Sequence, residues 1–267
     1  MVFTDNATAL TSRKGWEVGR YLLNWTILAI VLVGISFFMF SSFAYRFQWH
    51  RLWDFRALFL KGFFNTIVIA VFSLILSLCV GFLAGMARSS RVLFLRICSA
   101  FYIEVIRNTP LLVQILLFFY VGANAVGFQN RYIAGILIMS CFAGAYMAEI
   151  VRSGIESIET KQLESAASLG LTRGQVYRYV IFPQIIRRII PPLTGQLVSL
   201  IKDSSLLSII SVREFTMVAR EVTSVSYLNL ESYFLLAIGY MCMTYPISFI
   251  ARRLERRFDI YTHRSRD

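Results

Sequence analysis

Long apolar runs alternate with short polar and basic stretches along most of this chain. A helix of about 20 apolar residues is long enough to cross the hydrocarbon core of a bilayer. Each of six runs has about that length or more, so the pattern predicts an all-α, polytopic transmembrane helical bundle with six spans. The predicted spans are 22–40, 62–87, 98–126, 132–152, 185–212 and 232–251.

The first run has a competing interpretation, a cleaved signal peptide with Ala44 at the cleavage site. The apolar region of a signal peptide covers about 7–15 residues, and residues 22–40 form a longer run than that. We therefore expect this run to be retained as a helix that follows a polar N-terminal segment, residues 1–21.

The composition also indicates a membrane protein, because 57% of the 267 residues are hydrophobic and the mean hydropathy is +0.63. The net charge of +12 could indicate a nucleic-acid partner. However, the basic residues flank the apolar runs and do not form one stripe. We therefore expect them to orient helices in lipid, and we expect no nucleic acid as a partner.

The basic residues are unevenly divided between the two sides of the predicted membrane. Six spans place both termini on one side, where the segments contain 18 Lys and Arg residues against 7 on the other side. Loops rich in Lys and Arg stay in the cytoplasm. We therefore predict cytoplasmic termini, a cytoplasmic loop at 153–184 and a basic cytoplasmic tail at 252–267, around a transmembrane domain at 22–251.

The sequence contains no recognisable catalytic centre. Its four cysteines, Cys79, Cys98, Cys141 and Cys242, lie in or beside apolar runs, so we interpret them as small core residues and not as disulfides or metal ligands. A phosphate-binding P-loop, G-x-x-x-x-G-K-[ST], is also absent. We expect no catalytic residue, no metal site and no cofactor in this chain, which has no P-loop to hold ATP phosphates.

The polar stretch 161–183 predicts two short helices joined by a bend. Gly170 can adopt the left-handed conformation that ends the first helix. Thr172 and Gln175 form a capping box that begins the second helix. We expect Pro183 to end that second helix, because proline removes a backbone donor.

The first of these helices carries mostly small side chains on its surface, together with a single carboxylate. Small side chains allow another protein to approach closely, and a carboxylate offers that protein a charged hydrogen-bond acceptor. An amphipathic helix lying on the bilayer is the alternative, but residues 162–170 contain none of the Trp, Phe and Lys that such helices use. The residues we expect to form the docking surface are Glu164, Ala166, Ala167, Gly170 and Leu171.

Charged and polar residues inside the predicted spans are candidates for a solute pathway, because ionisable groups are costly at membrane depth. Glu104 and Arg107 are one helical turn apart and can pair. For Glu149 and Arg152 two interpretations stay open, a structural gate or an interfacial salt bridge, and for Asn65 and Thr66 the alternative is a helix–helix hydrogen bond. The candidate pathway residues are Asn65, Thr66, Arg107, Thr109, Gln114, Tyr146, Lys202, Asp203 and Ser204.

The polar stretch resembles the EAA loop of ABC importer permeases, in which E-x-A-A-x-x-x-G is followed by hydrophobic residues and a proline. In that family the loop is the coupling helix that lies in a groove of the ATPase subunit. The chain departs from the usual pattern at Ser165, Lys161 and Phe182, and these changes keep the carboxylate, the small surface and the bend.

Three further motifs resemble the subgroup that imports polar amino acids: R-N-T-P-L-L-V-Q from Arg107, G-A-Y-M-A-E-I-V-R-S-G-I from Gly144, and K-D-S-S-L from Lys202. With the polar stretch these motifs cover about residues 61–251 in the expected order. The subgroup usually has threonine where Ser204 stands. The resemblance implies the five-span core of type I ABC importers, to which this chain adds an N-terminal helix.

The resemblance implies a multi-pass permease in a bacterial cytoplasmic membrane that works by alternating access. Its partners would be two ABC ATPase subunits, a second permease chain, an extracytoplasmic amino-acid-binding protein and membrane lipid. A permease for another small solute, an ion-coupled secondary transporter and a membrane scaffold are the alternatives. The sequence leaves open which amino acid is carried and whether the second permease chain is identical or paralogous.

Overall fold

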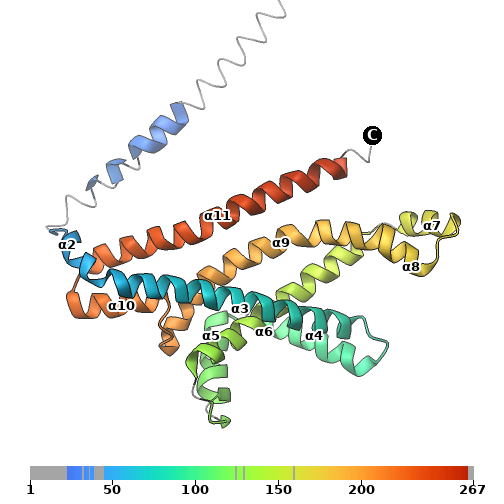
Figure 1. The fold of residues 1–267 in the computed structure, drawn as a ribbon, viewed down its shortest axis with the longest axis horizontal. Coiled ribbons are helices and arrows are strands. Elements are labelled where there is room, and N and C mark those ends of the chain that lie inside the picture. The colour runs from blue at the N-terminus through green and yellow to red at the C-terminus, as the bar shows by residue number, and fades with distance from the viewer. Residues whose placement is uncertain are drawn as a thin grey trace, which may run out of the picture. The chain divides into compact units, whose positions relative to one another are not determined.

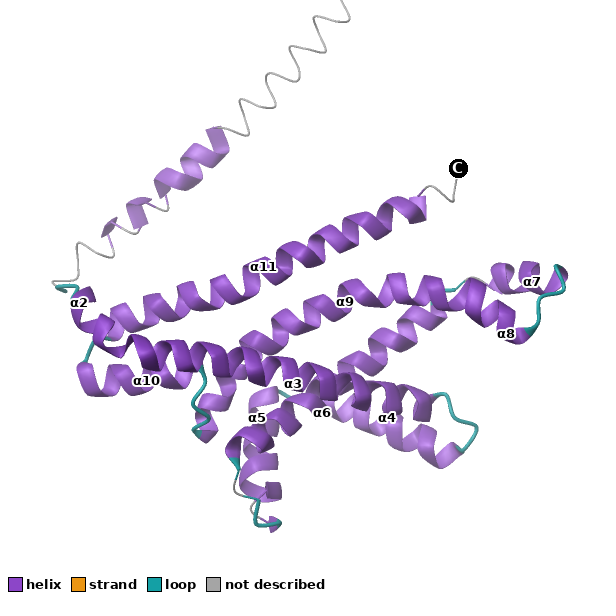
Figure 2. Cartoon of the chain, viewed as in Figure 1, coloured by secondary structure: helices purple, strands orange, loops and turns teal. Residues whose placement is uncertain are grey.

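The computed structural model describes residues 23–31, 33–35, 37–38, 45–123, 125–128, 130–158 and 160–263. All the regular elements in these ranges are helical, as Figure 2 shows. The chain divides into two units, Met1–Phe47 and Gln48–Asp267. In the first unit the described residues between 23 and 38 are helical, whereas the predicted segment 1–21 and the ends of the predicted span 22–40 lie outside the described residues.

The second unit is an all-helical bundle (Figure 1). Its elements are α2 (Trp49–Leu52), a 3₁₀ turn (Trp53–Phe55), α3 (Arg56–Arg88), α4 (Leu93–Asn108), α5 (Leu111–Leu116), a π-helical stretch (Leu117–Ala123), α6 (Arg131–Glu156), α7 (Thr160–Ser168), α8 (Arg173–Val176), a second π-helical stretch (Tyr177–Ile181), α9 (Phe182–Asp203), a 3₁₀ stretch (Ser204–Ile210), α10 (Phe215–Ser226) and α11 (Asn229–His263).

The bundle is built around α3 and α6, which share its largest interface. Two glycines allow this approach. A Cβ atom at Gly81 would lie 2.4 Å from the Cβ of Met147, and a Cβ at Gly144 would lie 2.6 Å from Cγ1 of Val80. Small residues at such crossings let membrane helices pack backbone to backbone, so these two positions set the spacing of the central pair.

The buried core lies where α3 and α6 meet the end of α9 and the start of α10. Ile69, Met139, Leu200 and Leu207 are each at most 2% exposed. Many apolar side chains on the outside of the bundle are exposed, including Phe64 on α3 and Phe94 on α4. This distribution, with an apolar exterior around a small core, is that of helices surrounded by lipid.

Three described helical segments are long and apolar enough to cross a membrane: Trp49–Arg88, Arg131–Glu156 and Asn229–Leu254. The number becomes five if two bent helix pairs each count as one span. A described helix at Leu23–Ile35 is apolar but shorter. The structure therefore agrees with a polytopic helical bundle and leaves the count of six as a prediction.

The predicted third span, 98–126, is not one helix. The chain turns by 112° between Leu93–Asn108 and Leu111–Ala123. Pro110 lies at the break, with backbone angles of −63° and 136°, and it provides the extended residue before α5. Proline also disfavours helical conformation in the residue before it, and Thr109 is accordingly extended.

Two further expectations, one about Pro183 and one about the cysteines, are wrong. Pro183 does not end a helix, because the π-helical stretch Tyr177–Ile181 passes directly into α9. The Phe182 amide bonds the carbonyl of Tyr177, five residues back, and this wider turn accommodates a following residue that has no amide hydrogen. The four cysteines are free and lie on exposed faces of the helices, not in the protein core.

Candidate functional site

The bend after α7 has the geometry that its sequence predicts. Gly170 has a φ of +73°, in the left-handed region that favours glycine. The amide of Leu171 donates to the carbonyl of Ala166 (3.2 Å), and the amide of Gly170 donates to that of Ala167 (2.9 Å). These two bonds close the end of α7 in the manner of a glycine C-cap.

The second short helix begins with the predicted capping box. The amide of Gln175 donates to Oγ1 of Thr172 (3.4 Å), and the amide of Thr172 donates to Oε1 of Gln175 (2.8 Å). Two amides that a helix start would leave without partners are thereby satisfied. The sequence therefore determines both sides of the bend locally.

The surface around this bend is open. The side chains of Glu164 and Ala167 and the residue Gly170 are exposed, Leu171 is half-buried, and Ala166 is 5% exposed. The Glu164 carboxylate makes no hydrogen bond or ion pair with the described part of the chain, and α7 and α8 lie together at one end of the second unit (Figure 1). The predicted docking residues thus form an exposed turn, except that Ala166 faces inward.

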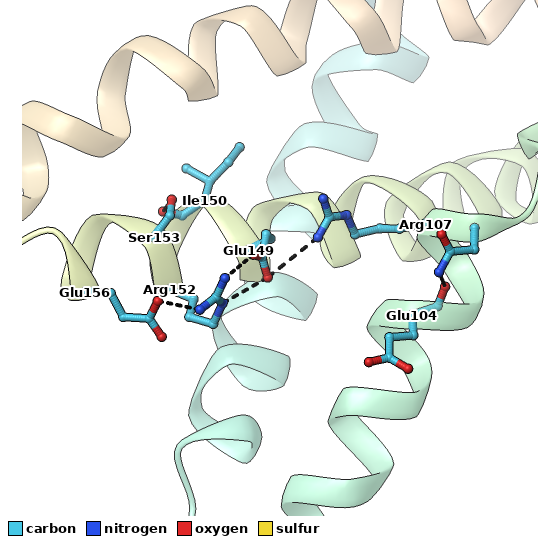
Figure 3. Close-up of polar contacts among 8 residues, drawn as sticks. Glu104, Arg107, Glu149, Ile150, Arg152, Ser153 and Glu156 are labelled. Carbon is cyan, nitrogen blue, oxygen red and sulfur yellow. Dashed lines mark hydrogen bonds and ion pairs between the residues drawn. The ribbon is translucent and has the colours of Figure 1, made fainter.

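A row of charges connects α4 to α6 (Figure 3). Nη1 of Arg107 lies 3.6 Å from Oε2 of Glu149. Arg152 bonds Glu149 on one side and Glu156 on the other. The Arg107 guanidinium also lies over the ring of Tyr146, 5.5 Å from its centroid, in a cation–π contact.

The pair that Glu104 and Arg107 could form is not the one in the structure, because Arg107 bonds Glu149 of α6. The Glu104 carboxylate forms no ion pair with the described residues, and only its backbone carbonyl accepts a bond, from Asn108 (Figure 3). Of the two interpretations of Glu149 and Arg152, the structure contains the salt bridge, which extends through Arg107 to α4, and a gate stays a prediction.

These charges face a cavity of about 330 Å³. Its lining contains two arginines and two glutamates, with one amide and one phenol: Arg88, Arg107, Glu104, Glu149, Asn108 and Tyr146. Nη1 of Arg88 is buried and has no hydrogen-bond partner among the described residues. A small zwitterion carries a carboxylate, which needs a cationic donor, and an ammonium group, which needs an anionic acceptor. A cavity of this size lined by arginines and glutamates offers both.

Gln114 and Thr109 hold the break between α4 and α5. The Gln114 amide nitrogen donates to the carbonyl of Ile106 (2.8 Å), to the carbonyl of Thr109 (3.1 Å) and to the hydroxyl of Thr109 (2.7 Å). Gln114 is 4% exposed, so its bonds replace the helical bonds that the break removes. These two residues shape the wall of the bundle near the cavity and do not line it.

Asn65 and Thr66 bind backbone groups just before and at the start of α10. The Asn65 side chain donates to the carbonyl of Arg213 (2.8 Å), and the Thr66 hydroxyl accepts from the amide of Phe215 (3.0 Å). Thr66 is fully buried. The helix–helix hydrogen bond, one of the two interpretations of these residues, is therefore the one that the structure contains.

Lys202, Asp203 and Ser204 lie where α9 passes into the 3₁₀ stretch. Lys202 is exposed and makes no hydrogen bond or ion pair with the described residues, whereas Asp203 is half-buried. Ser204 is fully buried and donates to the carbonyl of Ile201 (2.8 Å). The three neighbours in sequence thus point to different surroundings, and they lie on another part of the bundle than the cavity lining.

Two residues that the sequence did not single out form a buried polar centre. The Glu214 carboxylate accepts from the amides of Thr216 (2.8 Å) and Met217 (2.7 Å) and from the hydroxyl of Tyr240 (3.0 Å). Glu214 is 0% exposed. Glutamate is not a preferred N-cap and Tyr240 lies in an apolar run, so no local pattern identified either residue.

Comparison with known families gives one clear assignment. Residues 77–260 match the model of the binding-protein-dependent transport system inner membrane component. The matched residues include the charged row, the bend after α7 and the buried centre at Glu214.

Curated relatives match over nearly their whole length. The chain is 36% identical over 219 residues to the glutamine transport system permease protein GlnP of Escherichia coli K12, covering 80% of this chain and 99% of that protein. It is also 36% identical over 212 residues to the probable glutamine ABC transporter permease protein GlnP of Bacillus subtilis 168, covering 77% and 93% of the two chains.

Solved structures give the same result. A chain from the crystal structure of an amino acid ABC transporter with histidines superposes with a TM-score of 0.74 at 32% identity, covering 80% of this chain and 100% of that one. A chain of the MetNI methionine ABC transporter in inward-facing conformations shares the fold at 19% identity, with a TM-score of 0.59 and coverage of 77% and 98%.

Proposed function

We propose that this chain, which belongs to the family of binding-protein-dependent transport system inner membrane components, is the permease subunit of an ABC importer for polar amino acids. The observation that carries this conclusion is the match to glutamine permeases over 99% of their length. The cavity between α4 and α6 agrees with it, because its charges of both signs suit the two charged groups of an amino acid.

The exposed bend after α7 is the proposed docking surface for the ATPase. Glu164, Ala167, Gly170 and Leu171 would contact the ATPase groove, and the buried Ala166 would hold the turn from inside. The complex we propose contains two ABC ATPase subunits, a second permease chain, identical or paralogous, and an extracytoplasmic binding protein that delivers the amino acid. ATP and Mg²⁺ would bind to the ATPase subunits, and this chain would need no cofactor.

The proposed orientation places both termini and the bend after α7 in the cytoplasm, with six spans in the bacterial inner membrane. The charge asymmetry of 18 against 7 basic residues supports this orientation. The span at 22–40 would be an addition to the five-span core, since it lies before all the motifs that resemble the family and outside the matched residues 77–260.

Transport would proceed by alternating access. ATP-driven closure of the ATPase subunits would draw the two coupling bends together and open the path outward. Arg107 and Tyr146 would contact the amino acid in the cavity, and Lys202 and Asp203 would act elsewhere on the path. Thr109 and Gln114 would hold the bend of the wall, whereas Asn65, Thr66 and Ser204 would fix neighbouring helices.

Co-purification followed by reconstituted uptake tests the proposed function. The tagged permease, expressed with the ATPase and binding protein of the same transporter, should recover the ATPase and take up at least one labelled polar amino acid on addition of ATP. A secondary transporter would instead show uptake driven by an ion gradient without ATP. Failure to recover any ATPase, or uptake of only unrelated small solutes, would contradict the proposal.

Removing Arg107 or Lys202 should lower uptake without harming assembly. Arg107 is 39% exposed, and Glu149 keeps Arg152 as a partner, so Arg107→Ala should cost less than about 1 kcal/mol in stability. Lys202→Ala breaks no bond with the described residues. Uptake rates of reconstituted complexes are the measurement, with Arg96→Ala, an exposed position on α4, as the control. Wild-type uptake in both variants would assign these residues a structural role only.

A further inference from the structure

One helical segment connects the proposed docking bend to the buried polar centre. The chain is helical without interruption from Arg173, just after the bend, to Ile210. These 38 residues correspond to roughly 55 Å of helix. The segment then turns by 47° into α10, through Ser211, whose φ of 59° lies in the left-handed region.

The end of this segment next to α10, here called the far end, is buried, whereas the part nearer the docking bend is not. Leu200, Leu207 and Ile210 are at most 1% exposed. Between residues 182 and 199, by contrast, Pro191 is the only buried position and the other residues are half-buried or exposed. Packing therefore restrains the two ends of the segment very differently.

Between the two ends lie two adjacent prolines, Pro191 and Pro192, inside α9. Each removes one backbone donor from the helix, and proline is a common cause of bending in long helices. Gly195 follows within one turn, and a Cβ there would meet no atom within 4 Å. The segment can therefore bend at these prolines at low cost.

The turn after the segment is bound to two other helices. From α3, Asn65 and Thr66 hold the carbonyl of Arg213 and the amide of Phe215. From α11, the Tyr240 hydroxyl bonds the Glu214 carboxylate at 3.0 Å and the Thr216 hydroxyl at 2.8 Å.

The Phe215 ring reinforces these bonds. It makes edge contacts with Phe59 and Phe63 of α3 and with Tyr240 of α11. A Cβ at Gly239 would lie 2.2 Å from this ring, so α11 approaches as closely as a glycine permits. Hydrogen bonds and ring packing thus fix the same short turn to α3 and to α11.

We propose that Glu214, Tyr240 and Thr66 are positioning residues that anchor the far end of the helical segment, so that movement of the docking bend is converted into bending at Pro191 and Pro192. Without the anchor the segment would slide along its axis, and the ATPase would cycle without changing access to the cavity. This inference rests on the proposed function, because it presumes an ATPase at the bend.

Two conservative variants loosen the anchor without opening the core. Tyr240→Phe keeps the ring against Phe215 and removes two hydrogen bonds. Thr66→Val keeps the shape of the side chain and removes the acceptor for the Phe215 amide. Tyr233→Phe is the matched control, since it makes the same change on an exposed side chain of the same helix.

The deciding measurement is the number of amino acids taken up per ATP hydrolysed, in proteoliposomes that contain the whole complex and the amino acid best transported by the wild type. We expect ATP hydrolysis close to wild type and uptake per ATP reduced roughly two- to tenfold in each variant, the range that corresponds to loss of one or two hydrogen bonds. The double variant should have a lower ratio than either single variant, because Thr66 binds the turn to α3 and Tyr240 binds it to α11. Tyr233→Phe should keep the wild-type ratio.

The outcomes separate this inference from the proposed function. If wild-type complexes show no ATP-driven amino acid uptake, the proposed function fails. If the wild type transports and both variants keep its ratio, or lose hydrolysis and uptake in equal proportion, the anchor has no role in coupling and the inference is overturned.

Discussion

Replacing Gly81 by leucine is expected to prevent the permease from folding into its bundle. A side chain at this position would occupy the space of Met147, whose Cβ would lie 2.4 Å away, and would approach the carbonyl oxygen of Gly144 at 3.0 Å. Backbone atoms cannot move aside as a flexible side chain can. Even Gly81→Ala should destabilise the bundle by about 1–3 kcal/mol, and the leucine should cost more, because α3 and α6 share the largest interface of the second unit.

The measurement is the yield of monodisperse permease in detergent, together with its thermal unfolding midpoint. Gly85→Leu is the matched control, one turn further along α3, where an added Cβ meets no atom within 4 Å. Gly85→Leu should retain the wild-type yield. A normal midpoint for Gly81→Leu would mean that the two helices do not approach as closely as the structure has them.

Replacing Gly170 by valine should leave the bundle intact and abolish coupling to the ATPase. Its φ of +73° is strained for a β-branched residue, at a cost of about 1–2 kcal/mol. A Cβ there meets no atom of this chain within 4 Å, so added bulk can clash only with a partner. We therefore expect normal membrane insertion and a near-complete loss of uptake and of substrate-stimulated ATP hydrolysis.

Two further variants of the same loop, compared with Gly170→Val, show how much the carboxylate and the bend each contribute to ATPase docking. Glu164→Ala removes one exposed acceptor of charge-assisted hydrogen bonds, each worth about 1.5–3 kcal/mol, so recovery of the ATPase should fall but not vanish. Gly174→Val adds the same bulk at a helical position with open space around it, and it should have the smaller effect. The amount of ATPase recovered with the purified permease is measured for all three. Full recovery with Gly170→Val would exclude this loop as the coupling element.

The features that the sequence predicted correctly depend on neighbours along the chain. The capping box at Thr172 and Gln175 and the left-handed Gly170 each involve residues at most five positions apart. The apolar runs predicted helices because lipid leaves no other way to satisfy the backbone. The family assignment was also accessible, since its motifs are contiguous stretches of sequence.

The tertiary structure decided which side chains meet. Arg107 could reach Glu104 on its own helix, yet it bonds Glu149, because α4 packs beside α6 and presents a second carboxylate at 3.6 Å. The sequence around Asn65 and Thr66 could not predict their hydrogen-bond partners, which are backbone groups almost 150 positions away.

Two helical predictions failed for a related reason. Proline was expected to end a helix at Pro183, but the chain stays helical through it, because the π-helical turn just before Pro183 accommodates a residue without an amide hydrogen. At Pro110 the expected continuous span is broken, and the break is stable only because Gln114 replaces the missing bonds. The same residue type thus has opposite outcomes, which depend on where the free backbone groups find partners.

The sequence by itself determined that this chain is a helical membrane permease with an exposed glycine bend after residue 168, because hydropathy, capping and family motifs are properties of short segments. Only the tertiary structure decided which polar side chains come together. The examples are the cavity lined by Arg88 and Arg107 and the turn at Glu214, which is bound to Tyr240. A buried polar group is stable only when it has hydrogen-bond partners, and in these two places some of the partners lie on other helices. No pattern within one helix contains that information.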